Sequence, residues 1–394
     1  MNTDTPDTGT AATSALGSQR HLFDVPEHIT YMNTANLAPR LRAVTEAGLA
    51  AVNRGTQPWT FTQNNWFNDA HRLRGLAARI MNARQDDVAL VPSVSYGIAI
   101  AAANLPIKAG QSIVILDQQF PSNVYAWRAA AKRTGAELRT VPRGADGTWT
   151  GEVLTAIDRN TAVVAVPNCH WTDGSIVDLR RVGAKARAVG AAFVIDASQS
   201  MGAMPIDVQE LQPDFLACVG YKWMLGPYGL GYFYASPRWQ ERAEPLEYSW
   251  ITRARSDNFA GLVDYTDDLQ PGARRFDMGE FAQFTMVPMA IAALTQLLAW
   301  GIDRVQATLS ELTRQIEEGA KSFGGVAAPA ANRGGHMIGI RLRGGLPDDL
   351  GDRLGAAQVF VSRRGDSIRV APHLHNTAAD VERLLTVLRE AVTK

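Results

Sequence analysis

One lysine stands out because nothing near it in the sequence can balance its charge. Lys222 lies in GYKWMLGPYGLG, residues 220–231, among aromatic, apolar and glycine residues and without an acidic neighbour. Burying an unpaired ammonium is costly. Lys222 is therefore a surface lysine whose stem covers apolar groups, a core lysine paired with a distant carboxylate, or a desolvated amine that forms a Schiff base.

Polar and aromatic side chains follow three short apolar runs. AFVID (192–196) ends in Asp196 and is followed by Gln199. VALV (88–91) is followed by Ser93, Val94 and Ser95. SIVIL (112–116) is followed by Phe120. Ordinary explanations exist: a helix N-cap for Asp196, a helix start at the serines and a core position for Phe120. Ligands of open parallel sheets bind at the carboxyl ends of the strands, so one shared site is the alternative.

Taken together, these residue types match the physical needs of pyridoxal 5'-phosphate (PLP). A carboxylate keeps the pyridine nitrogen protonated and makes the ring an electron sink. A lysine forms the Schiff base and moves protons at the substrate's α-carbon, while helix amides and hydroxyls hold the phosphate. An aromatic side chain fixes the plane of the ring. The set predicts a PLP site, whereas each residue alone does not.

The elements that would position these residues alternate along the chain. Further buried strands are expected at 162–166, 215–219 and 231–235, with amphipathic helices such as 122–136 and 178–191 between them. This alternation is typical of parallel α/β architecture. After about Gly279 the pattern changes to one long helix through 286–323, followed by strands and helices that predict a smaller α+β domain.

Composition excludes several classes of function. The 394 residues have a formal net charge of zero and no basic cluster, so we expect no nucleic-acid partner. Two cysteines, Cys169 and Cys218, provide neither a disulfide framework nor a metal site. Residues 1–20 have the composition of a disordered tail and not of a signal peptide. The uncharged run Ala89–Ile107 contains prolines and polar residues that disfavour a membrane span, so we expect a cytoplasmic protein without membrane contact.

The sequence resembles the class V aminotransferase group of fold-type I PLP enzymes, which includes cysteine desulfurases, isopenicillin N epimerase-like proteins and kynureninases. The resemblance runs from about Tyr31 to the C-terminus and is strongest in VIDASQSMGAMPIDV, GYKWMLGPYGLGYFYAS and IRVAPHLHNTAADV. It implies a large PLP-binding domain (41–280) with a mainly parallel seven-stranded sheet and a small C-terminal domain (281–394). Residues 21–40 would pack near the small domain and the substrate entrance.

The resemblance also implies roles for individual residues. Lys222 would be the catalytic Schiff-base lysine, and the cofactor contacts would be Val94, Ser95, Phe120, Asp196, Gln199, Tyr221 and Gly279. Arg369 would bind the substrate's α-carboxylate, with Trp171 and Asn36 as further substrate contacts. A homodimer with shared active sites is implied, in which the segment around Trp250, Arg253 and Gly279 serves the partner. Glu280 departs from the family's usual threonine, and its role near the partner's phosphate is open.

The reaction type does not follow from these residues, because one fold hosts many chemistries. Both cysteines precede Lys222, and we therefore expect that a cysteine desulfurase, which needs a mobile cysteine after the lysine, is unlikely. The expected activity is an aminotransferase acting on a small amino acid or amine. The alternatives are a lyase that cleaves a C–C or C–S bond, an epimerase, and a scaffold that keeps the fold without catalysis.

Overall fold

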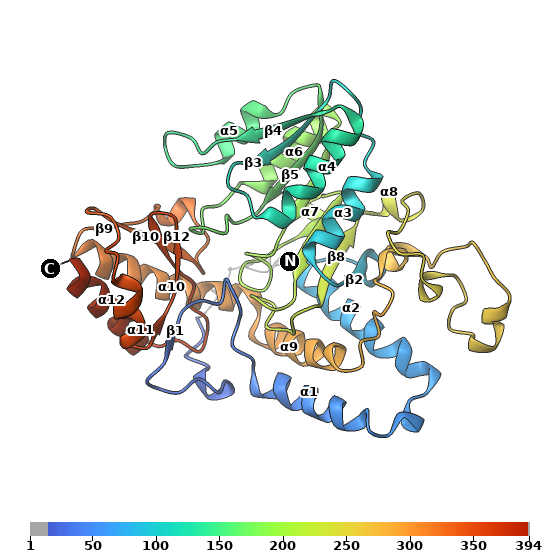
Figure 1. Ribbon diagram of the computed structural model, residues 1–394, viewed down its shortest axis with the longest axis horizontal. Coiled ribbons are helices and arrows are strands. Elements are labelled where there is room, and N and C mark those ends of the chain that lie inside the picture. Colours follow the sequence, from blue (N-terminus) through green and yellow to red (C-terminus); the bar gives the residue numbers. More distant parts are fainter. Residues whose placement is uncertain (1–14, 393–394) are drawn as a thin grey trace, which may run out of the picture.

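The computed structural model describes residues 15–392 and contains a larger and a smaller unit (Figure 1). The larger unit is built on a seven-stranded sheet of order β2-β8-β7-β6-β5-β3-β4. Its strands are β2 Val88–Val91, β3 Ser112–Leu116, β4 Glu137–Val141, β5 Thr161–Pro167, β6 Ala192–Asp196, β7 Phe215–Val219 and β8 Gly231–Ala235. Only β8 runs antiparallel to its neighbours, β2 and β7. The predicted mainly parallel seven-stranded sheet is confirmed.

Alternate residues of these strands face two separate cores, as a side-chain period of two requires. Ile113 and Ile115 belong to the core beneath α3 (Val94–Asn104) and α4 (Tyr125–Thr134). Val114 and Leu116 belong to the opposite core, which includes α2 (Asn68–Met81), α5 (Thr150–Ala156) and α6 (Leu179–Val189). The edge strand β4 is mostly exposed or half-buried, and its ELRTV sequence lacks the apolar run that identified the others.

The smaller unit is a four-stranded antiparallel sheet of order β12-β13-β10-β9 with helices packed around it. Its strands are β9 Gly325–Val326, β10 Ile338–Leu342, β12 Ser362–Arg364 and β13 Ser367–Val370, and its helices include α10 Ile302–Lys321, α11 Leu350–Ala356 and α12 Ala378–Val392. The remaining helices are α1 Arg42–Arg54, α7 Val208–Leu211, α8 Pro237–Gln240 and α9 Met286–Trp300.

The single long helix expected through 286–323 is two helices. Gly301, at φ 79° and ψ 125°, separates α9 from α10, and the two axes differ by 78°. A glycine adopts this positive φ without the steric penalty of a side chain. Among residues 15–392 no single helix is long and apolar enough to cross a membrane. Only α9 and α10 taken together, as this bent pair, have the required length and apolar composition. α9 packs against α1 and α2.

The N-terminal segment joins the two units. β1 (Thr30–Tyr31) pairs in parallel with β11 (Val359–Phe360), and Asn33 forms a bridge with Ala371. The amide of Ala38 donates to the carbonyl of Tyr221, 3.1 Å away, in the larger unit. Most of the predicted disordered tail, residues 1–14, lies outside the described residues. Its described part is packed, since the amide of Leu16 donates to Oγ1 of Thr308 at 2.7 Å.

Candidate active site

The carboxyl ends of the parallel strands meet around a cavity of about 260 Å³. Eight of the predicted site residues line it: Val94, Ser95, Phe120, Trp171, Asp196, Gln199, Tyr221 and Lys222. Ser93, Cys169, Ser198 and Tyr228 also line the cavity. The fold therefore gathers residues that lie more than a hundred positions apart in the chain into one small space.

Lys222 follows the end of β7 and points into this cavity with only 6% of its surface exposed. Within the described chain its amine forms no ion pair and no hydrogen bond; the Phe120 ring lies 5.2 Å and the Tyr221 ring 5.8 Å from Nζ. Burial lowers the pKa of Lys222 to about 8, although Asp196 opposes the shift. A sizeable neutral fraction near physiological pH makes the amine a nucleophile and a base.

Asp196 is the last residue of β6 and lines the same cavity. Its Oδ1 accepts the amide of Ser198 at 3.0 Å, so the carboxylate caps a turn, as an Asp at a strand end commonly does. Burial raises the pKa of Asp196, and the hydrogen bonds from Ser198 and the charge of Lys222 act against that shift. The two side chains do not form an ion pair. The carboxylate thus lines the same cavity as the lysine and can pair with a cationic ring nitrogen that binds there.

The first turn of α3 supplies the anion-binding end of the cavity. Ser93 is the N-cap, since its Oγ accepts the amide of Tyr96 at 3.2 Å, and it also lies 2.8 Å from Oγ of Ser95. The amides at the start of a helix have no partner within it and point at whatever binds there. Together with the partial positive charge of the helix N-terminus, these amides form an anion-binding site at Val94 and Ser95 that suits a phosphate group.

Gln199 is held in one orientation by contacts that the sequence did not indicate. The indole N–H of Trp223 donates to its Oε1 at 2.9 Å, and its Nε2 donates to the carbonyl of Ala35 at 3.0 Å. Nε2 of His336 contacts the main-chain oxygen of Gln199. The carboxamide therefore keeps one N–H free for a group in the cavity.

Arg369 lies behind Trp171 and not in the lining of the cavity. It is 1% exposed, and it donates to the carbonyl of Trp171 at 2.7 Å and to Oδ1 of Asn33 at 3.3 Å. Burial, followed by the charge of Arg364, lowers the pKa of Arg369 to about 9. Asn36 is exposed and lies outside the lining, so the N-terminal residue that reaches this arginine is Asn33.

Gly279 also lies outside the cavity of its own chain. Its amide donates to Glu247, and Glu280 beside it is exposed. The expected contact of this segment with a partner's cofactor therefore stays a prediction about the assembled protein.

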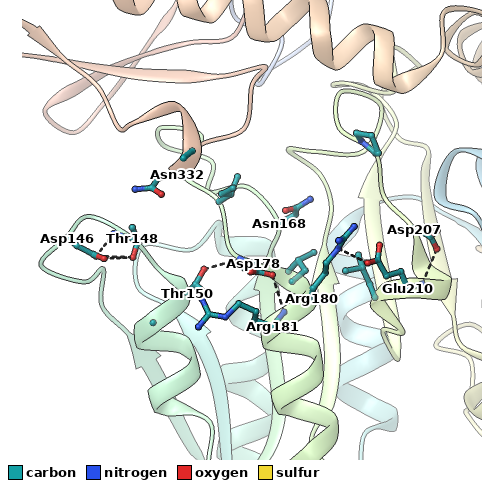
Figure 2. A pocket seen from close by; sticks show the side chains of 16 residues that line it. Asp146, Thr148, Thr150, Asn168, Asp178, Arg180, Arg181, Asp207, Glu210 and Asn332 are labelled. Carbon is teal, nitrogen blue, oxygen red and sulfur yellow. Dashed lines mark hydrogen bonds and ion pairs between the residues drawn. The ribbon is translucent and has the colours of Figure 1, made fainter. Parts of the chain in front are cut away.

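A pocket larger than this cavity lies elsewhere, beside the first turn of α6 (Figure 2). It measures about 760 Å³ and is open to solvent, but its polar groups are mostly paired. Asp178 caps α6 through the amide of Arg181 at 3.1 Å, and Arg180 pairs with Glu210 at 2.7 Å. It contains no lysine that could form a Schiff base. No group of His, Cys, Asp or Glu in residues 15–392 could hold a metal ion.

Comparisons with known proteins identify the family of the chain. The profile of the family described as Aminotransferase class-V matches residues 41–384. The uncharacterized aminotransferase YcbU of Bacillus subtilis is 28% identical over 306 residues, 77% of this chain and 79% of that protein. A probable cysteine desulfurase of Methanothermobacter thermautotrophicus is 25% identical, covering 93% of this chain and 96% of that protein. The apo structure of a cysteine desulfurase from Thermococcus onnurineus has a TM-score of 0.84 at 20% identity, covers 96% of this chain and 99% of that one, and shows the fold.

The expectation that a cysteine desulfurase is unlikely is wrong. Several relatives that carry this name match the chain, two of them over more than nine-tenths of its length. The order of Lys222 and the two cysteines in the sequence is no ground for excluding that activity. The buried lysine, the carboxylate in the same cavity and the helix start fit PLP, and the family match extends over both units. The chain belongs to the class V aminotransferase family, and its cofactor is PLP.

Proposed function

We propose that the protein acts at the α-carbon of a small L-amino acid and releases a substituent from its β-carbon, with sulfur as the first candidate. The observation that carries the proposal is the Lys222 amine, which is buried and unpaired and lines the same cavity as Asp196. The names of the desulfurase relatives support the choice of a C–S bond. The aromatic wall of Phe120 and Trp171 supports it too, because sulfur makes favourable contacts with ring edges.

Each residue has a defined part in this chemistry. When bound, PLP withdraws electrons from the α-carbon of an amino acid. Lys222 would hold the cofactor and move the proton at the substrate's α-carbon, and its lowered pKa suits both tasks. Asp196 keeps the pyridine nitrogen protonated, and the first turn of α3 holds the phosphate. Arg369 is the proposed partner of the α-carboxylate, which would have to replace the hydrogen bonds of this guanidinium to Trp171 and Asn33.

The cavity's size limits the substrate. About 260 Å³ must hold both the cofactor ring and the amino acid, which supports a short side chain. Trp171 sets this limit, because its indole N–H donates to the carbonyl of Gln118 at 2.7 Å and the ring packs edge-on against Phe120 with 5.5 Å between centroids.

Transamination is the second candidate, favoured by the name of the relative YcbU. It begins with the same proton removal by Lys222 and differs in where the proton returns. Incubation of the PLP-loaded protein with L-cysteine, with and without a 2-oxo acid, separates the two. Pyruvate, ammonia and sulfide formed without the 2-oxo acid support elimination at the β-carbon, and alanine formed as the sulfur passes to an added thiol, which becomes a persulfide, supports cleavage of the same bond. Turnover only with the 2-oxo acid supports transamination.

The control for this experiment is Lys222→Ala, which must abolish product formation. If amino acids leave the absorbance of the yellow wild-type protein unchanged and no product forms, the protein is a scaffold and the proposed function is wrong. Racemised amino acid without other products would indicate an epimerase instead.

We also propose a homodimer in which the segment 244–280 reaches the partner's site. Tyr248 is 72% exposed and Tyr265 97% exposed in one chain, and Trp250 is more than one-third exposed. Large aromatic side chains clustered on a surface are typical of interfaces. Sedimentation velocity should give twice the mass of 42.7 kDa, and a single-chain mass at micromolar concentration would contradict the proposal.

A further inference from the structure

The outer end of the active site carries an arginine to which the proposed function gives no task. Arg364 is the last residue of β12, and its guanidinium carbon lies 5.3 Å from the centre of the Trp171 ring. Trp171 lines the cavity, so the guanidinium lies just beyond that wall. One NH group of Arg364 donates to the carbonyl of Arg363 at 2.8 Å, whereas its Nε is buried without a partner.

The positive charge of Arg364 is not balanced by protein. Neither Arg364 nor Arg369 forms an ion pair with any carboxylate among residues 15–392. Asp366, two residues along, pairs with Arg341 at 3.0 Å, and Asp173 pairs with Arg143 at 2.7 Å. These two carboxylates thus already form ion pairs with other arginines.

The charge of Arg364 contributes to the electrostatic potential at Lys222 and Arg369. Its charge contributes to lowering the pKa of both Lys222 and Arg369. Three cations therefore share a region in which Asp196 is the one carboxylate lining the cavity. The cofactor's phosphate binds at α3, and the substrate's α-carboxylate occupies Arg369, so one guanidinium still has no counter-charge.

Resting on the proposed function, we propose that Arg364 gives this site a preference, among small amino acids, for those whose side chain carries a second anionic group, so that L-cysteine with its mostly neutral thiol is a weaker ligand than an anionic analogue. Keeping a guanidinium half-buried without an anion costs free energy. The planar guanidinium group still has N–H donors without acceptors, and their geometry suits a carboxylate or a similar oxyanion. The α-carboxylate of the substrate goes to Arg369, which contacts the main chain of Trp171, and the side-chain anion goes to Arg364, which lies over the ring of the same residue. The stacking of Arg364 on that ring holds the guanidinium in place.

The test compares L-aspartate with L-asparagine, which have nearly the same shape and differ in the side-chain charge. Each is titrated into the PLP-loaded wild-type protein, and the dissociation constant is read from the change in the cofactor's visible absorbance. Wild type should bind aspartate at least about tenfold more tightly than asparagine, as one charge-assisted hydrogen-bonded contact provides. Arg364→Gln should remove this preference and leave the affinity for asparagine within about twofold. Arg364→Lys should retain part of it, since the charge remains without the planar guanidinium.

Arg363→Gln is the matched control. Arg363 is exposed, and its Nε contacts the carbonyl of Gly365, so the variant loses the same charge one residue away. It should bind aspartate as wild type does. Equal binding of the two amino acids by wild type, or equal losses in both variants, would refute the role of Arg364 while leaving the proposed function intact. If neither amino acid nor L-cysteine changes the absorbance, the proposed function fails as well.

Discussion

Replacing the buried lysine should stabilise the protein while destroying its function. Lys222→Met keeps a long unbranched side chain in the cavity and removes the ammonium. The pKa of Lys222 falls from 10.5 to about 8 because burial disfavours the charged form. One pKa unit corresponds to 1.36 kcal/mol, so folding the charged lysine costs about 3 kcal/mol at neutral pH. The cofactor-free variant should be more stable than wild type by roughly this amount at pH 7.

The stability difference between Lys222→Met and wild type should depend on pH. The unfolded chain keeps the lysine protonated up to about 10.5, whereas the folded chain releases that proton above about 8. Between these values the unfolded state binds more protons, so the wild type gains stability as pH rises. Below about 8 the full cost is present. The advantage of Lys222→Met should therefore be largest at pH 7 and shrink towards pH 10.

Urea unfolding of the cofactor-free proteins at pH 7 and pH 9.5 measures this difference, at one protein concentration. Lys185→Met on α6 is the control, since Lys185 is exposed and forms no ion pair in the described chain; it should change stability by less than about 0.5 kcal/mol at either pH. A variant at position 222 that is less stable than wild type at both pH values, or equally stabilised at both, would refute the reasoning.

Three further changes test the surroundings of the site by urea unfolding. Trp223→Phe should cost about 1–3 kcal/mol, because it leaves the buried Oε1 of Gln199 without its donor, and a loss below about 0.5 kcal/mol would argue against that hydrogen bond. Arg74→Met should cost about 3–5 kcal/mol, because it leaves Asp277 buried without its ion-pair partner, and unchanged stability would mean that Asp277 is already neutral. Gly202→Ala should cost more than about 2 kcal/mol, because φ is +96° and the new methyl group meets the carbonyl of Trp223; wild-type stability would contradict this contact.

The sequence was informative where local pattern decides structure. Six strands were expected from short apolar runs of the fully buried kind, and β5 differs from its expected bounds by one residue at each end. Residues at the carboxyl ends of such strands must meet at one edge of the sheet, which brought Asp196, Ser95 and Phe120 into the cavity that Lys222 enters. Strand β4 was missed because an edge strand needs no apolar face on both sides.

Contacts between distant segments were beyond such reasoning. Trp223 and His336 orient Gln199 across 24 and 137 residues, and neither type carries a local signal for that role. The break at Gly301 was missed because the apolar period continues through it and only the positive φ reveals the turn. Asn33 and Asn36 lie in one short turn, and the backbone path alone decides that the former meets Arg369.

The pairing of β1 with β11 has a mechanical consequence. Together with the bridge from Asn33 to Ala371, it ties the N-terminal strand to the small unit, so the positions of Asn33 and Arg369 are fixed relative to each other by main-chain pairing. Trp171 belongs to the other unit. The hydrogen bond from Arg369 to its carbonyl is one of several contacts between the two units here, because the amide of Gly339 donates to the carbonyl of Asp173 and the amide of Ile176 to the carbonyl of Asn332, so the wall of the site that carries Trp171 is fastened to the smaller unit at several points.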